Sequence, residues 1–154
     1  MVKPIVTSVD IAADPSFVWE QLADIGAHAD WMTEAESIEF LTGARDGVGA
    51  RIRVRTRIGP MVVADVMDFT KWEPPKSMDI AHIGRVGGTG RFELEPVGSG
   101  TRLTWTEILS FPWYLGGALG AAVAGPVLRR VFMANLRRFA SAATGSFPPN
   151  RDRA

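Results

Sequence analysis

The chain has 154 residues with 17 acidic and 17 basic side chains, so its formal net charge is zero. This balance argues against a general nucleic-acid binder, which usually carries a basic excess. A hydrophobic content of 46% argues against disorder, and the absence of cysteine excludes disulfides, thiol nucleophiles and thiolate metal sites. A chain of this length suits one domain, which we expect over 1–146, followed by a flexible tail at 147–154.

The aromatic residues are almost all of the apolar kind, with five tryptophans, eight phenylalanines and a single tyrosine. Such a set predicts a large apolar interior or an internal cavity, which a domain of this size is able to bury. The first ten residues contain no long apolar stretch of the secretory type. We therefore expect the cytoplasm as the location.

The N-terminal part predicts one strand followed by helix. Alternating apolar residues indicate a strand over Val2–Ile11. Asp14 and Pro15 then form a helix start, because Asp accepts free amide hydrogens and Pro needs no donor there. Gly26 suits the end of that helix, and a short second helical piece is expected to end near Trp31.

The middle of the chain has the pattern of antiparallel strands. They are expected at 37–41, 51–58, 61–69, 78–85, 90–95 and 101–109, with a hairpin turn at Gly87–Gly88. The segment Arg51–Ile58 reads RIRVRTRI, so its arginines take one face and its apolar residues take the other. An anion site is one interpretation of these arginines, but we favour pairing with outward Glu93, Glu95 or aspartates on neighbouring strands.

The C-terminal part predicts a long helix with an apolar stripe. The stripe consists of Leu128, Phe132, Leu136, Phe139 and Ala143. The preceding segment, 110–128, has no charge and reaches the lower end of a membrane span. We favour a buried or surface-lying segment of the fold, because glycine, alanine and proline make it weakly apolar, and contact with a membrane surface is the alternative.

Together these elements predict an α+β fold in which a curved antiparallel sheet wraps around the long C-terminal helix. An apolar sheet face has to be covered, and this helix is the element long enough to cover it. A strongly curved sheet around one helix leaves a cavity between the two layers. We therefore expect a helix-grip architecture with an internal cavity.

Several stretches resemble the START-like superfamily, also called SRPBCC or Bet v 1-like, and within it the bacterial polyketide cyclase/dehydrase proteins. They are IAADPSFVWEQLAD (11–24), Trp31, the Gly47–Gly49 pair, WEPP (72–75) and GSGTRLTWTEIL (98–109). These stretches occur in the expected order and cover nearly the whole chain. The resemblance implies the helix-grip fold, but the superfamily includes lipid carriers, hormone receptors and cyclases, so it implies no single activity.

Two polar residues are candidates for acid–base chemistry. Leu103, Trp105 and Glu107 share one strand face, and the resemblance implies that this face looks into the cavity. His82 is in register with Met78 and would be the only histidine available there. An acid or base in such a place could transfer a proton or orient a ligand hydroxyl. The alternatives are a solvated or arginine-paired Glu107 and a hydrogen-bonded core His82.

We expect no metal and no cofactor. His28 is expected in an exposed loop, and two histidines so far apart, without a carboxylate at ligand spacing, make a poor metal site. A Gly-Lys-Ser/Thr phosphate loop and a Gly-x-Ser-x-Gly esterase turn are both missing from the sequence.

The first hypothesis is a carrier or sensor that binds an apolar small molecule, such as a lipid or polyketide, in the cavity. The expected lining residues are Trp31, Ile52, Val54, Phe92, Leu94, Leu103, Trp105, Phe111, Trp113, Phe132 and Leu136. Phe111 and Trp113, followed by small mobile residues, would suit a lid. The alternatives are a polyketide cyclase or dehydratase that uses Glu107 and His82, and a membrane-surface or partner-binding module. No nucleic-acid partner is expected, and the sequence leaves the oligomeric state open.

Overall fold

The computed structural model describes residues 3–144, so the expected tail at 147–154 lies outside the described residues. The elements are β1 (Ile5–Ile11), α1 (Pro15–Ala23), η1 (Ile25–Ala27), α2 (His28–Trp31), β2 (Ala35–Phe40), β3 (Arg51–Ile58), β4 (Met61–Glu73), β5 (Ser77–Ile83), β6 (Gly87–Val97), β7 (Gly100–Ser110), η2 (Trp113–Leu115) and α3 (Gly117–Ala143). Apart from their bounds, they follow the order that the sequence predicts.

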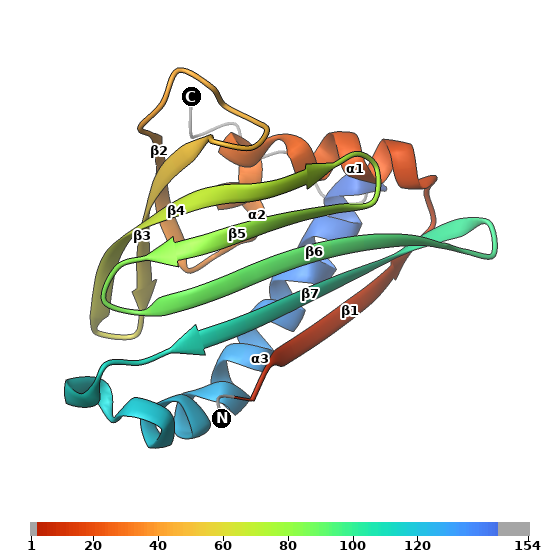
Figure 1. Cartoon of the computed structure of the whole chain (residues 1–154). Coiled ribbons are helices and arrows are strands. Elements are labelled where there is room, and N and C mark those ends of the chain that lie inside the picture. The colour runs from red at the N-terminus through yellow and green to blue at the C-terminus, as the bar shows by residue number, and fades with distance from the viewer. Residues whose placement is uncertain (1–2, 145–154) are drawn as a thin grey trace.

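The seven strands form one antiparallel sheet in the order β1-β7-β6-β5-β4-β3-β2. The sheet curls, and α3 runs along its concave face while α1 and α2 lie at one end (Figure 1). The α+β architecture predicted from the sequence is therefore confirmed. Its core lies between the concave face and the second half of α3, where Phe132, Leu136 and Phe139 are buried.

The start of α1 forms as its sequence predicts. The Asp14 carboxylate accepts a hydrogen bond from the Ser16 backbone nitrogen at 3.3 Å, and Pro15 is the first helical residue. Val18 and Leu22 then face inward and are fully buried. The helix closes one end of the curled sheet, so its cap helps to seal that end of the core.

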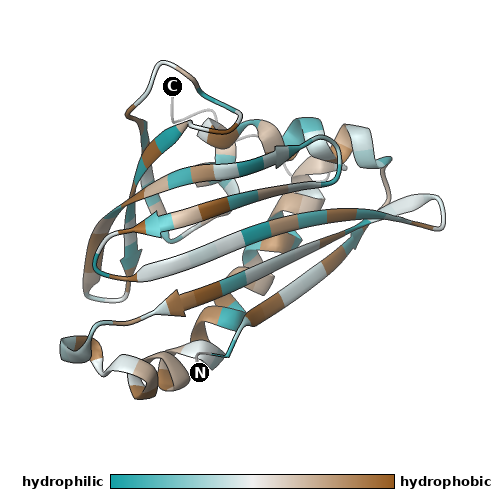
Figure 2. Ribbon diagram, in the orientation of Figure 1, coloured by the Kyte–Doolittle hydropathy of each residue, from teal (hydrophilic) through white to brown (hydrophobic). Residues whose placement is uncertain are grey.

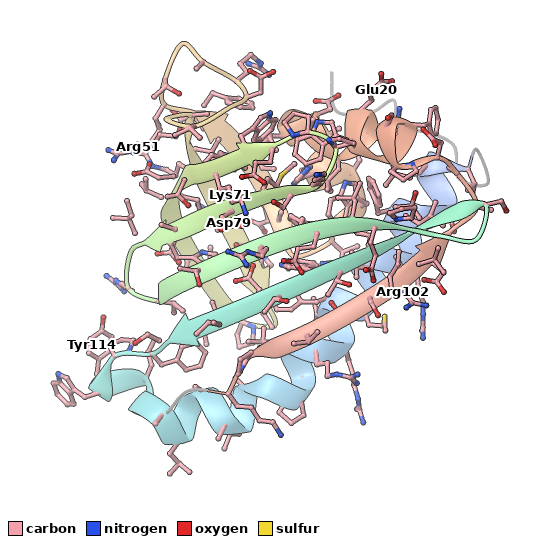
Figure 3. The ribbon with its side chains drawn as sticks, turned by 45° about the vertical axis from the view of Figure 1, so that its right-hand side comes forward. Glu20, Arg51, Lys71, Asp79, Arg102 and Tyr114 are labelled. Carbon is pink, nitrogen blue, oxygen red and sulfur yellow. The ribbon has the colours of Figure 1, made fainter. Side chains whose placement is uncertain are left out.

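The convex face of the sheet carries ion pairs between neighbouring strands. Arg51 pairs with Asp68 at 2.6 Å, and Arg53 pairs with Glu39 at 2.9 Å. Arg55 and Arg57 both form ion pairs with Glu36. These guanidinium groups hold the pKa values of the Asp68 and Glu36 carboxyls below their usual range. Figure 3 shows Arg51 and Arg102 at this outer surface.

Pairing therefore accounts for all four arginines of β3 without an anion. The expected pairing with outward carboxylates is confirmed, but the partners come from β2 and β4 and are not Glu93 and Glu95. The reason is the strand order, because β2 and β4 flank β3 while β6 lies three strands away. Exposed pairs of this kind contribute little to stability.

The glycine- and alanine-rich segment belongs to α3 and does not form the loop that a mobile lid requires. α3 begins at Gly117, directly after Gly116, which has the left-handed φ of 90°. A Cβ on Gly120 would lie 2.1 Å from the Leu115 carbonyl oxygen, so only glycine lets η2 pack closely on the first turn of α3. Among the described helices, α3 alone has the length and apolar composition of a membrane span. It is also the helix around which the sheet curls.

Most strand boundaries differ from the sequence prediction by a few residues, and two of the differences matter for the site. β4 extends to Glu73, and β6 already begins at Gly87. The expected turn at Gly87–Gly88 therefore lies within β6, and the chain turns instead at 84–86. Glycine pairs are typical of hairpin turns, but here Gly87 and Gly88 are strand residues of β6 and pair with β7.

Candidate functional site

A cavity of about 200 Å³ lies between the concave face of the sheet and α3. Its lining is mostly apolar and consists of His28, Met32, Glu34, Ile38, Ile52, Val54, Thr56, Ile58, Met61, Val63, Asp65, Met67, Phe69, Ile80, His82, Val86, Phe92, Trp105, Glu107, Leu109, Phe111, Leu128 and Phe132. A depression on the convex face is larger, at about 320 Å³, but mostly polar and charged side chains line it. The concave cavity is therefore the candidate site for an apolar ligand.

His82 and Glu107 meet inside this cavity, although they come from strands that are not neighbours. His82 lies on β5 and Glu107 on β7, with β6 between them. On β6, Gly88 faces His82 and Gly90 faces Glu107 in the strand register. Because neither glycine has a side chain, His82 Nε2 reaches across β6 to Glu107 Oε2 at 2.9 Å.

Gly90 is required for this arrangement. A Cβ at position 90 would lie 2.5 Å from Glu107 Oε1 and 2.9 Å from the Ile80 side chain. Contacts this short do not occur, so any other residue would displace the carboxylate. The glycine therefore makes room for an acidic side chain in the middle of the sheet.

The Glu107 carboxylate is buried and hydrogen-bonded through both oxygens. Its exposed fraction is 3%, Trp105 Nε1 donates to Oε1 at 2.8 Å, and His82 lies at Oε2. When the carboxylate accepts from His82 Nε2–H, His82 Nδ1 keeps its lone pair. Within the described residues no hydrogen bond is formed at Nδ1. The cavity therefore offers one free acceptor on His82.

A second set of polar side chains lies on the α3 side of the cavity. Asn135 of α3 is fully buried, and its Nδ2 donates to both oxygens of Glu34 at 2.8 Å. Arg138 contacts the Asn135 Oδ1 and donates to the Trp31 carbonyl oxygen at 3.0 Å. Burial raises the pKa of the Glu34 carboxyl, while the hydrogen bonds from Asn135 act in the opposite direction.

Aromatic rings form the floor between these polar groups. Trp105 packs against Phe132 of α3 and Phe92 of β6, with ring centroids 4.4 and 5.1 Å apart. Behind them Trp31 packs against Phe139 at 5.1 Å. The apolar aromatic composition of the chain thus gathers around one interior, as the sequence predicts.

The structure brings eight of the thirteen residues predicted for the site to the cavity wall. They are Ile52, Val54, His82, Phe92, Trp105, Glu107, Phe111 and Phe132. Trp31, Leu94, Leu103 and Leu136 are buried in the core but do not line the cavity. These four side chains do point inward. They lie towards the end of the sheet that α1 closes, where side chains fill the interior.

Two predictions about single residues are wrong. Trp113 is 87% exposed on η2 and does not line the cavity, because η2 carries it beyond the end of the sheet. His28 is buried and not in an exposed loop, since it begins α2 and its Nε2 donates to the Leu22 carbonyl oxygen at 2.7 Å. His28 also lines the cavity, so His82 is not the only histidine there.

Sequence reasoning missed Glu34 and Asp65 as acidic lining residues. On β4 the structure turns Asp65 to the cavity and Asp68 to Arg51. Glu34 lies just before β2, where no periodicity applies. The sequence contained one indication that His82 and Glu107 could meet. The glycines of β6 leave space between the two side chains.

The model of one protein family matches residues 4–144, and its description reads polyketide cyclase/dehydrase and lipid transport. The chain belongs to this family. The START-like resemblance of the sequence is therefore confirmed. No curated protein matches the chain by sequence.

Solved structures agree on the fold. A TTHA0849 structure from Thermus thermophilus has a TM-score of 0.78 at 19% identity and covers 95% of this chain and 100% of its own. The Zhui aromatase/cyclase from Streptomyces sp. R1128 has a TM-score of 0.73 at 18% identity, with 92% and 93% covered. Ara h 8.0201 has a TM-score of 0.70 at 10% identity, with 94% and 99% covered. These similarities confirm the helix-grip, Bet v 1-like fold of this family member.

Proposed function

We propose that this protein is a carrier or sensor that binds a small, uncharged and largely apolar ring compound in the cavity between the sheet and α3. The observation that carries the proposal is the lining itself, in which aromatic and aliphatic side chains surround one hydrogen-bonding pair, His82–Glu107. Apolar burial would supply the affinity, and the pair would orient one ligand hydroxyl. Membership of a family described by polyketide cyclase/dehydrase and lipid transport supports this kind of ligand.

The charges of the lining favour an uncharged ligand over an anion. Glu34, Asp65 and Glu107 contribute carboxyl groups to the wall, and no lysine or arginine does. A ligand carboxylate would lose its hydration without gaining a cationic partner, and burial of an unpaired charge is expensive. The cavity volume of about 200 Å³ lies below the roughly 300–1,000 Å³ of drug-sized pockets, so a compound of one or two rings fits it best.

Calorimetric titration with three matched bicyclic compounds tests this proposal. We expect 2-naphthol to bind up to roughly tenfold more tightly than naphthalene, because its hydroxyl would donate to His82 Nδ1 and one such hydrogen bond contributes about 0.5–1.5 kcal/mol. The anion 2-naphthoate is expected to bind most weakly. Glu107→Gln should reduce the preference for naphthol, whereas Glu95→Gln, which changes an outward glutamate of β6, should not. If none of the three compounds binds, the proposed function is wrong.

Proton transfer is a second candidate function, and the free Nδ1 of His82 favours it. His82 Nδ1 would take the α-proton of a bound β-hydroxyketone, and the resulting imidazolium would return this proton to the departing hydroxyl. The products are an enone and water, and His82 ends unchanged. Glu107, at 2.9 Å from Nε2, would stabilise the imidazolium between the two transfers. This is the dehydratase alternative of the sequence analysis, with a separate role for each residue.

The test is the dehydration of a β-hydroxyketone that carries one aromatic ring, because the enone product absorbs in the near ultraviolet. We expect His82→Gln to lower turnover by about 10²–10⁴-fold while substrate affinity changes little, as for loss of a general base. Glu95→Gln again serves as the control. Equal rates for the wild type and His82→Gln would leave binding as the only function of the cavity.

A further inference from the structure

The first half of α3 presents an exposed apolar surface that the fold does not use. Trp113 and Tyr114 on η2 are followed by Leu119, Val123 and Val127 on α3, and we call these five residues the apolar ridge. Their exposed fractions are 87%, 54%, 75%, 70% and 54%. The spacing of four residues places Leu119, Val123 and Val127 along one face of the helix. Large contiguous apolar surfaces of this kind mark interaction sites.

The apolar ridge lacks a partner within the described residues. The fully buried residues of α3 begin only at Phe132, and of the preceding turns only the partly buried Leu128 and Val131 pack against the core. In Figure 1 this end of α3 projects beyond the ends of β1 and β7, and in Figure 2 it carries brown and white positions. Figure 3 shows Tyr114 at the outer edge of the same end.

The charged residues in the segment that carries the apolar ridge are all positive. No aspartate or glutamate occurs between Glu107 and Asp152. Arg129 and Arg130 follow the ridge directly and are exposed, and neither forms an ion pair with any residue of 3–144. Arg130 comes three residues after Val127 and so continues the same helix face.

The mouth of the cavity borders the apolar ridge. Phe111 and Leu128, which flank the ridge in the chain, both line the cavity, as does Met61 at the β3–β4 turn. Met61 is itself more than half exposed. Residues of the cavity wall therefore lie next to both ends of the ridge in the chain.

We propose that the apolar ridge, together with Arg129 and Arg130, docks this protein onto the surface of an anionic lipid bilayer. An interfacial helix with an apolar face and neighbouring basic side chains binds in this way, through apolar burial and attraction to acidic headgroups. Tryptophan and tyrosine at the end of the segment suit the headgroup region. This proposal goes beyond the proposed function, because an apolar ligand could bind without any membrane.

The charges argue against a second copy of the chain as the occupant. A symmetric dimer brings the same surface patch together with itself. The ridge and its two arginines would then pack against the same segment of the other copy, and residues 108 to 151 contain no carboxylate with which the arginines could pair. Acidic lipid headgroups supply that missing negative charge.

Co-sedimentation with vesicles tests the proposal on the full chain. We expect binding to vesicles of phosphatidylcholine with phosphatidylglycerol, weaker binding to phosphatidylcholine alone, and loss of the difference at high salt. Val123→Asp should weaken binding roughly tenfold, because it places a charge in the apolar face. Its control is Val48→Asp, which makes the same change at a valine that is 67% exposed on the β2–β3 loop. Arg130→Glu should abolish the preference for acidic lipid, and Lys76→Glu on the β4–β5 turn is its control.

Three results would overturn the proposal. They are the absence of vesicle binding, equal binding by the Val123→Asp and Val48→Asp variants, and a dimer in sedimentation velocity that Val123→Asp dissociates while vesicles are not bound. The last result would assign the apolar ridge to a second copy. Because naphthol binding is measured without lipid, failure of this proposal is distinguishable from failure of the proposed function.

Discussion

Lowering the pH from 7 to 4 is expected to destabilise this protein by about 3 kcal/mol through His28 alone. Burial lowers the pKa of His28 from 6.5 to about 4, with the hydrogen bond to the Leu22 carbonyl acting in the opposite direction. Between these two values the unfolded chain binds a proton that the folded chain does not. The free energy of unfolding therefore falls as the pH falls through this window, and the contribution of His28 is complete above about pH 6.5.

The measurement is the free energy of unfolding in urea at several pH values for the wild type and for His28→Gln. The variant should be less stable at pH 7, because it loses a buried hydrogen bond, but its stability should decline less between pH 6.5 and 4. The raised pKa of Glu34 gives a slope of opposite sign in both proteins and cancels in the comparison. Parallel curves for the wild type and His28→Gln would contradict the burial of this histidine.

Replacing Gly90 by alanine is expected to lower the free energy of unfolding by about 1–3 kcal/mol, the usual effect of overpacking. The added methyl group would meet Glu107 Oε1 and Ile80 on the concave face of the sheet. The carboxylate would have to leave its positions against Trp105 Nε1 and His82 Nε2. Naphthol affinity should therefore fall together with stability.

Gly87→Ala is the matched control for this change. Gly87 lies on the same strand, has no heavy atom within 4 Å of an added Cβ, and does not require a left-handed backbone. Alanine there should leave both stability and naphthol affinity nearly unchanged. Equal effects of the two substitutions would mean that general strand propensity, and not the space for Glu107, determines the result.

The face of each strand was predictable because alternation is a local property of the chain. Alternate residues of a strand share one face, as Leu103, Trp105 and Glu107 do on β7 and Met78 and His82 do on β5. In the structure Glu107 and His82 both line the cavity. The cap at Asp14 and the buried stripe of α3 follow from equally local patterns. Local patterns therefore predicted the main outline of the fold and which residues share a face, whereas the START-like resemblance supplied the inward direction of the face that carries Glu107.

What the sequence could not predict depends on distances between strands or on where an element ends. The contact between His82 and Glu107 requires that glycines of β6 lie between β5 and β7, which only the strand order shows. The burial of His28 depends on the Leu22 carbonyl, which lies six residues earlier and is turned towards it by the end of α1. The position of Trp113 depends on η2, whose path no periodicity fixes.

The division of the sheet into a paired outer face and a cavity-lining inner face has a consequence for evolution. On the outer face of β3 the arginines form ion pairs with carboxylates of β2 and β4. On its inner face Ile52 and Val54 line the cavity. Substitutions at the inward positions can therefore change what is bound and leave the outer pairs intact. Ile52 and Val54 are also buried core residues, so selection for a new ligand and selection for folding act together on the inward face. The fold itself is kept in structures that share only 10–19% identity with this chain, with TM-scores of 0.70–0.78.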